Sequence, residues 1–255
     1  MNLTVCELPH DSDRLDEAWV GLVEHCRAHG SDAVLLPEMP FSVWLAATKE
    51  LDPERWDDAV ATHEAWLERL GELGASIVLA SRPVVVDGHR HNEAFVWESG
   101  SYQKSHHKYY LPEEDGFWEA TWYDRGTGRF PALETALGKV GFLMCTEVWF
   151  TEHARALGRD GVEVLATPRS TEWASRDKWL AGGRAAAVMS GAFGMSSNRS
   201  GTDALGMRWG GLGWIIDPDG GVLATTSEDE PFATVTVDPL DAQRAKATYP
   251  RYVAE

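Results

Sequence analysis

Hydrophobic and polar positions alternate along the first half of the chain in two periods, one typical of strands and one of helices. Continuous apolar runs of strand length predict buried strands over 2–8, 33–36 and 77–80. Apolar residues at helical spacing predict one amphipathic helix from Leu15 to about Gly30 and a second over roughly 53–73. This half of the chain therefore alternates strand and helix.

The middle and the end of the chain carry hairpin patterns instead. Runs over 93–97 and 101–107, joined by Glu98–Ser99–Gly100, predict a β-hairpin, and Asp217–Pro218–Asp219–Gly220 predicts a tight turn. Residues 108–136 have many turn formers and no period, which predicts a long functional loop. The other predicted elements are strands over 139–144, 162–166, 195–198, 214–216 and 234–237 and helices over 151–158 and 172–190. This order favours an α/β fold with sheets face to face and helices outside, rather than one doubly wound parallel sheet.

Composition places the chain among globular proteins and excludes one large class of partner. The 255 residues are 44% hydrophobic and 25% charged and contain no Gly/Ser/Pro-rich linker, which predicts a single domain over 1–255. We expect its core to cover about 1–240 and residues 241–255 to form a short tail. Lysine plus arginine number 23 and aspartate plus glutamate 40, a net charge of −17, so no nucleic-acid partner is expected.

The ends, the long runs and the cysteines predict a cytoplasmic protein. No signal-peptide pattern opens the chain, and no run approaches the roughly 18 apolar residues that span a bilayer, so no membrane partner is expected. The three cysteines, Cys6, Cys26 and Cys145, are odd in number and widely spaced. That pattern fits neither a disulfide framework nor a CxxC zinc site, and it suits a reducing compartment.

Three reactive side chains follow predicted buried strands. Glu38 follows AVLLP, Lys108 follows the strand over 101–107, and Cys145 follows KVGFLM. Strand ends are rigid supports beside variable loops, where active sites are commonly built. A carboxylate can take the proton of a thiol and an ammonium can stabilise an oxyanion, so the three suffice for nucleophilic catalysis. Each residue alone is more often structural, and the hypothesis rests on the three together.

Longer stretches around these residues resemble the carbon–nitrogen hydrolase (nitrilase) superfamily over nearly the whole chain. LLPEMPF, KYYLPEEDGFWE and GFLMCTEVWF correspond to the family's Glu, Lys and Cys motifs in the family's order, and SSNRSG (196–201) is similar to its Asn-Arg-x-Gly strand end. The resemblance implies a four-layer α-β-β-α sandwich that needs neither a metal nor an organic cofactor. It also implies a homodimer or higher homo-oligomer paired through the helices at 151–158 and 172–190.

Catalytic roles follow from the same resemblance, which implies thiol-dependent hydrolysis of a non-peptide C–N bond in a small amide or N-carbamoyl substrate. The implied catalytic residues are Glu38 as general base, Lys108 as oxyanion partner, Cys145 as nucleophile and Glu119 as a second acid. Glu119 would position Lys108, or the attacking water and the leaving group. The backbone N–H of Thr146 would complete the oxyanion site. The reaction would pass through a thioester on Cys145.

Substrate selection is expected to involve the residues after the nucleophile and several aromatics. Thr146 stands where Trp or Tyr is common in the family, and Glu147 keeps the family's acid. Val148–Trp149 replaces the arginine of carboxylate-binding carbamoylases, which disfavours an acidic substrate. Aromatic side chains near the motifs suggest an apolar or flat acyl pocket. The candidate oxyanion and substrate-binding residues are Thr146, Glu147, Trp149, Trp118, Phe41 and Trp173.

Alternative functions stay open at this point. His89 and His91 alternate along a strand as metal ligands can, but no HxxxH or Cys/His set accompanies them, so we interpret them as polar hairpin residues. A nitrilase would use the same three residues on a nitrile, an acyltransferase would pass the same thioester to an amine, and a non-catalytic homologue would use the fold for binding. An amidase ranks above a nitrilase, because only Glu147 agrees with the Trp-Glu pair that follows the nucleophile in some nitrilases.

Overall fold

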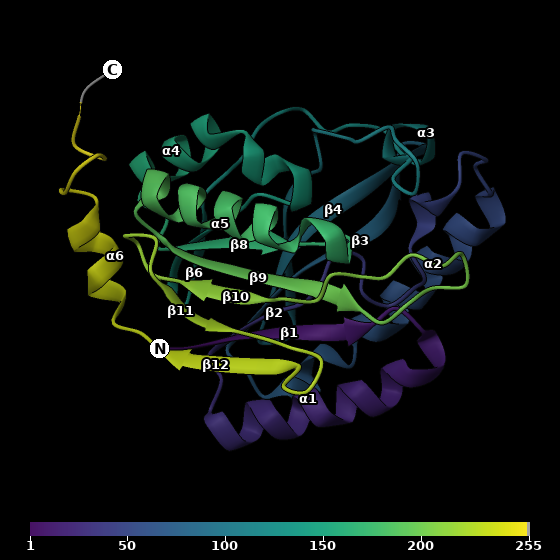
Figure 1. Cartoon of the computed structure of the whole chain (residues 1–255), viewed down its shortest axis with the longest axis horizontal. Helices are drawn as coiled ribbons and strands as arrows, with labels where there is room; N and C mark the ends of the chain where they lie inside the picture. The colour runs from purple at the N-terminus through teal and green to yellow at the C-terminus, as the bar shows by residue number, and fades with distance from the viewer. Residues whose placement is uncertain (254–255) are drawn as a thin grey trace.

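Residues 1–253, which the computed structural model describes, form twelve strands in two half-sheets (Figure 1). The first half-sheet runs in the order β12 (Phe232–Thr236), β1 (Asn2–Pro9), β2 (Ala33–Leu35), β3 (Ile77–Val86), β4 (His89–Glu98) and β5 (Ser101–His107). The second runs β11 (Val222–Thr225), β10 (Trp214–Ile216), β9 (Phe193–Ser200), β8 (Val164–Pro168), β7 (Gly138–Phe142) and β6 (Leu133–Thr135). Strands β1 and β9 pair in parallel near their carboxyl ends and join the two halves.

Helices cover the outer faces of the two half-sheets, so the fold has four layers. Helices α1 (Leu15–His29) and α2 (Pro53–Leu67) lie on the side of the first half-sheet, and α4 (Thr151–Arg159) and α5 (Arg176–Ser190) on the side of the second (Figure 1). The α-β-β-α sandwich implied by the resemblance is confirmed. Among the helices of residues 1–253, none has the length and apolar composition that crossing a bilayer requires.

Strand β1 shows how the sequence builds these layers. Its side chains alternate between the two faces of the sheet. Leu3 and Val5 belong to the core between the half-sheets, whereas Cys6 and Leu8 belong to the layer under α1. On α1 the buried residues follow helical spacing, namely Leu15, Trp19, Leu22 and Cys26, and each large apolar side chain buried there is worth roughly 1.5–3 kcal/mol.

Several predicted boundaries shift in the structure. The predicted helix over 53–73 ends as α2 at Leu67 and resumes as a 3₁₀ turn over Leu70–Leu73, where Gly71 weakens an α-helix. Strand β3 continues past residue 80 to Val86, because it pairs with β4 along its whole length. The predicted loop over 108–136 contains the short helix α3 (Glu119–Trp122) and strand β6, which lack a readable period because they are so short.

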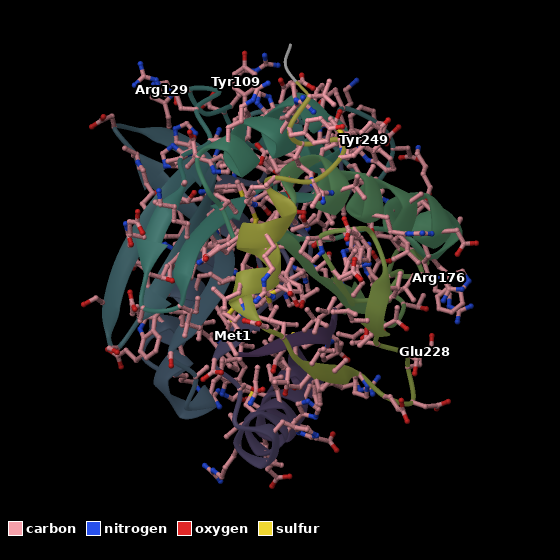
Figure 2. All side chains as sticks on the ribbon, turned by 90° about the vertical axis from the view of Figure 1, so that its left-hand side faces the viewer. Met1, Tyr109, Arg129, Arg176, Glu228 and Tyr249 are labelled. Atoms are coloured by element: carbon pink, nitrogen blue, oxygen red, sulfur yellow. The ribbon has the colours of Figure 1, made fainter. Side chains whose placement is uncertain are left out.

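The core extends beyond residue 240, where the sequence analysis placed its end. Helix α6 (Pro239–Ala245) starts beside Met1, whose amino group donates to the carbonyl oxygen of Val237 (Figure 2). Ala242 is fully buried in the core between the half-sheets. The ammonium of Lys246 donates to three backbone carbonyls, which fixes the end of the helix on the body of the domain. The last two residues of the expected tail lie outside the described part.

Candidate active site

Glu38 and Lys108 form a buried ion pair beyond the ends of β2 and β5. Nζ of Lys108 lies 2.8 Å from Oε1 of Glu38, and both side chains are fully buried. The loop that carries Glu38 is braced by Arg199, whose guanidinium donates to the Glu38 carbonyl oxygen at 3.1 Å. Ser170 donates to the same carbonyl at 3.1 Å. The structure therefore brings together the two charges that the sequence placed after separate strands.

Glu119, at the start of α3, is the second carboxylate on Lys108. Its Oε2 lies 2.6 Å from Nζ and also accepts a hydrogen bond from the hydroxyl of Tyr123. Burial raises the pKa of Glu119 to about 7, the positive Lys108 opposes the rise, and the negative Glu38 adds to it. Burial alone would lower the pKa of Lys108, but attraction to Glu119 and Glu38 outweighs it and raises that pKa. The amine is therefore protonated at neutral pH.

Cys145 opens the 3₁₀ helix η4 (Cys145–Trp149) in a strained backbone conformation. Its φ is 44°, in the left-handed region that side chains other than glycine rarely adopt. Burial raises the pKa of its thiol, the negative Glu38 adds to the rise, and Lys108 opposes it. A hydrogen bond from the backbone of Ser170 also favours the thiolate. The net effect keeps the thiol protonated at neutral pH, so it needs a base before it can attack.

Glu147 braces the site and does not face a substrate. Its Oε2 accepts from the backbone N–H of Met144 at 2.8 Å and from Nε2 of His106 at 2.9 Å. Its Oε1 accepts from the backbone N–H of Tyr109 at 2.7 Å. These bonds tie the turn that carries Cys145 to the end of β5. The expected role of Glu147 in oxyanion or substrate binding stays a prediction, and protein donors already occupy both of its oxygens.

A small pocket of about 110 Å³ opens at Cys145. The residues that line it include Glu119, Thr146, Ser170, Phe117, Glu114, Glu172, Lys178 and Trp179. A wider cleft of about 530 Å³ shares Glu172 with it and continues over Trp44, Trp209 and the loop around Met207. The arrangement offers a narrow space beside the thiol and a broad space further out.

Two of the expected pocket aromatics belong to the body of the protein. Phe41 is buried under α1 and α2, stacked on Trp66 with ring centroids 4.5 Å apart. Trp149 is 37% exposed and packs on α5 against Trp179 and Gly182, where a side chain larger than hydrogen at position 182 would meet the indole at 2.9 Å. The residue types suggested a pocket, but the neighbouring helices take these rings away from Cys145.

The other two expected aromatics lie outside the thiol pocket. Trp118 packs against the hydrophobic cluster that contains Trp44, Trp56 and Trp122. The ammonium of Lys49 lies 4.9 Å from its ring centroid. Trp173 lines the wide cleft, with the guanidinium groups of Arg176 and Arg208 at 3.2 and 3.5 Å from its ring centroid. Figure 2 shows Arg176 at the edge of the molecule. The aromatic residues that line the pocket at Cys145 are Phe117 and Trp179, and they stand there beside polar side chains.

Sequence reasoning missed three residues that support the charged cluster. Tyr123 could have been found from its position one helical turn after Glu119. Arg199 was within reach, because it lies in SSNRSG, a motif that the sequence analysis singled out. Asn92, whose amide donates to Glu38 at 2.8 Å, carries no signal in the sequence, because it stands among other polar residues at the start of β4.

The histidines of the β3–β4 hairpin are engaged by Asp124. Nδ1 of His89 lies 3.1 Å from its carboxylate, and Nδ1 of His91 lies 2.9 Å from its carbonyl oxygen. Within residues 1–253, no three or more His, Cys, Asp or Glu side chains are grouped so that they could hold a metal ion. The three cysteines are free and buried.

Comparison with known proteins places the whole chain in one family. The carbon-nitrogen hydrolase family model matches residues 4–247. The citrullinase of Francisella tularensis is 27% identical over 236 residues, which cover 85% of this chain and 81% of that protein. The N-carbamoylputrescine amidase of Arabidopsis thaliana is 25% identical over 252 residues, which cover 88% of this chain and 81% of that protein.

Solved structures agree on the fold. The carbon–nitrogen hydrolase of Helicobacter pylori superposes with a TM-score of 0.85 at 21% identity and covers 98% of this chain and 94% of its own. An amidase from Nesterenkonia sp. superposes with a TM-score of 0.77 at 18% identity and covers 95% of this chain and 92% of its own.

Proposed function

The chain belongs to the carbon–nitrogen hydrolase family, and on that premise we propose that it hydrolyses a small amide or N-carbamoyl compound through a thioester on Cys145. The observation that carries the proposal is the buried cluster of Glu38, Lys108 and Glu119 beside the thiol. Two carboxylates and one ammonium are costly to bury, so their presence calls for a functional explanation.

The first half of the proposed reaction forms the thioester. Glu38 takes the proton of the Cys145 thiol as the sulfur attacks the carbonyl carbon. The carbonyl oxygen becomes an oxyanion, held by the Lys108 ammonium and the backbone N–H of Thr146, and each such donor is worth roughly 3–4 kcal/mol. The intermediate collapses, the C–N bond breaks, and the proton on Glu38 passes to the leaving ammonia or amine.

The second half releases the product. Water attacks the thioester carbonyl and gives a proton to Glu38, which is again the base. The C–S bond then breaks, the acid leaves, and the proton returns to the sulfur. Glu119 holds Lys108 in place through both halves, so that the ammonium meets each oxyanion in turn. No redox partner is needed, and every proton is accounted for.

The pocket dimensions favour a substrate with a small reacting head. A volume of about 110 Å³ holds a carboxamide or ureido group but little more, and the remainder of a longer substrate would lie in the 530 Å³ cleft. Two relatives are named for citrulline and for N-carbamoylputrescine, and both of these compounds carry a terminal ureido group. In a glutamate-to-glutamine mutant of the amidase of Nesterenkonia sp. AN1, acrylamide has undergone Michael addition at the active-site cysteine, which also agrees with a thiol nucleophile.

A substrate screen with ammonia detection tests this proposal. Ureido compounds, linear amides and nitriles of matched chain length are offered to the wild type, to Cys145→Ala, and to Cys26→Ala as a matched control, since Cys26 is a buried thiol on α1. We expect turnover of amides or ureido compounds, lost in Cys145→Ala and kept in Cys26→Ala. Preferential turnover of nitriles would establish a nitrilase, and full activity of Cys145→Ala would overturn the mechanism.

A second assay separates hydrolysis from acyl transfer. Hydroxylamine added during turnover competes with water for the thioester and forms a hydroxamate. Under the proposal, acid remains the main product when a physiological amine replaces hydroxylamine. An amide product in that case would identify an acyltransferase. No ammonia release and no adduct with any compound of the panel would favour a non-catalytic homologue.

A further inference from the structure

We propose that Asn92, on β4, is a positioning residue that makes Oε2 of Glu38 the basic oxygen. This inference rests on the proposed role of Glu38 as general base. Asn92 donates from Nδ2 to Oε1 of Glu38 at 2.8 Å, and Lys108 donates to the same oxygen at 2.8 Å. Within residues 1–253, Oε2 is buried and has no hydrogen-bond partner.

The unequal sharing of hydrogen bonds between the two oxygens of Glu38 costs folding free energy and needs a physical cause. A buried carboxylate oxygen without a donor forfeits its solvation, and rotation about the last side-chain torsion would exchange the two oxygens or share the donors between them. Lys108 alone could follow such a rotation, because its ammonium has three hydrogens and a flexible stem. A second donor with a fixed position removes that freedom, so that one oxygen stays capped and the other stays bare.

Asn92 has the rigidity that this task requires. It is fully buried, and its backbone carbonyl accepts from the backbone N–H of Lys108 at 2.8 Å, so the same residue fixes both partners of the ion pair. Its own Oδ1 has no hydrogen-bond partner in residues 1–253. A flipped amide would set Oδ1 against Oε1 of Glu38, oxygen against oxygen, so the donor orientation follows from the contact itself.

The consequence for the reaction is a choice of oxygen. A carboxylate oxygen that accepts two hydrogen bonds is a weaker base than one that accepts none, because both bonds stabilise its negative charge. Capping Oε1 therefore leaves Oε2 as the oxygen that takes the thiol proton. Without Asn92, rotation of the carboxylate places a capped oxygen toward the thiol for part of the time, and a misplacement of about 1 Å in such groups can cost about 100-fold in rate.

The test combines two substitutions in a double-mutant cycle. The readout is the rate at which iodoacetamide alkylates Cys145, followed by peptide mapping, in the wild type, Asn92→Ala, Glu38→Gln and the double variant. If Asn92 acts through Glu38, Asn92→Ala slows alkylation by about 10–100-fold, and it adds less than about twofold in the Glu38→Gln background. Thr4→Val, which removes a buried hydroxyl on β1, is the control and leaves the rate unchanged.

A second variant keeps the test decisive if Asn92→Ala folds poorly. Asn92→Asp has the same shape, and its carboxyl can donate to Glu38 only while it is protonated. The alkylation rate and kcat of this variant are therefore expected to fall as pH rises, and the pH profile of the wild type should lack this decrease. KM should stay within about threefold of the wild-type value. A purely structural role would change the amount of folded enzyme and leave the pH profile unchanged.

The outcomes distinguish this inference from the proposed function. Loss of activity in Cys145→Ala and Glu38→Gln, together with additive effects of Asn92→Ala and Glu38→Gln, refutes the role of Asn92 and leaves the thioester mechanism standing. An unchanged alkylation rate in Asn92→Ala refutes it equally. If Glu38→Gln itself alkylates at the wild-type rate, the general base is misassigned and the proposed function fails first.

Discussion

Glu38 and Glu147 are two fully buried glutamates in the same region, and they differ in how their oxygens are used. Three protein donors fill both oxygens of Glu147: two backbone N–H groups and one imidazole. Glu38 has two donors crowded on Oε1, while Oε2 has no partner within residues 1–253. One carboxylate is satisfied, and the other has a bare oxygen and interacts electrostatically with the Cys145 thiol.

The difference separates a stabilising carboxylate from a reactive one. A buried polar group with all of its hydrogen bonds rigidifies the structure, whereas an unsatisfied one costs folding free energy and persists where function requires it. Glu147 holds the turn that presents Cys145, and Glu38 is free to accept a proton. The same isosteric change, glutamate to glutamine, should therefore have opposite effects at the two positions.

Glu38→Gln is expected to have the largest effect, and on rate alone. Removal of the general base should lower kcat by about 10²–10⁴-fold, because glutamine cannot take the thiol proton. The free energy of unfolding should stay within about 1 kcal/mol of the wild type, since the glutamine oxygen can still accept from Asn92 and Lys108 and Lys108 keeps its ion pair with Glu119. Steady-state kinetics and urea denaturation check both. A variant that loses stability by several kcal/mol would erase the contrast with Glu147.

Glu119→Gln should change how stability depends on pH. The pKa of Glu119 is raised by burial to about 7, so the folded protein binds a proton there that the unfolded chain releases above about pH 4.5. The stabilisation is complete below the unfolded pKa and is lost as pH rises toward 7, by roughly 3 kcal/mol in total. Urea titrations of both proteins between pH 4.5 and 8 measure it. A wild-type-minus-variant difference that stays constant over this range would contradict the assignment.

Glu147→Gln should lower stability rather than the chemical step. The new amide group would face a donor, either the backbone N–H of Tyr109 or that of Met144, so one buried hydrogen bond is replaced by a clash of donors. The expected loss is about 1–3 kcal/mol in the free energy of unfolding, with kcat reduced less than about 10-fold. Glu134→Gln, at the exposed middle position of β6, is the control and should change neither. A rate loss as large as that of Glu38→Gln would mean that Glu147 joins the chemistry.

Trp149→Ala should have the smallest effect. The indole is 37% exposed and lies on α5, outside the walls of the pocket at Cys145. Both kcat and KM should stay within about twofold, and stability should fall by no more than about 1 kcal/mol. A marked rise in KM would restore the role in substrate binding that the sequence suggested for this residue.

The reactive residues could be predicted because the motifs that carry them sit at strand ends. Glu38, Lys108 and Glu119 meet as expected, and Cys145 lies within their electrostatic reach. Pocket walls could not be predicted in the same way. An aromatic residue next to a motif can turn toward the pocket or toward a neighbouring helix, and Phe41 turned toward α1 and α2 because Trp66 offered a stacking partner.

The long strands and helices that form the layers could be predicted from the sequence, and the short elements could not. Long elements such as β1 and α1 repeat their period often enough to be recognised, and both appear where predicted. Helix α3 and strand β6 have four and three residues, too few for a period, and are fixed by tertiary contacts. Asn92 could not be predicted as part of the site, because its role depends on tertiary contacts with Glu38 and with the backbone of Lys108.

The proposed mechanism depends on a covalent bond forming at the sulfur of Cys145. Intact-mass analysis and peptide mapping after acid quench, with a slowly turned-over amide from the screen, test this most directly. The thioester mechanism predicts the mass of the acyl group on the peptide that contains Cys145, absent in Cys145→Ala and formed far more slowly in Glu38→Gln. Turnover without any adduct under conditions that trap thioesters, or an adduct on Cys6 or Cys26 alone, would contradict it.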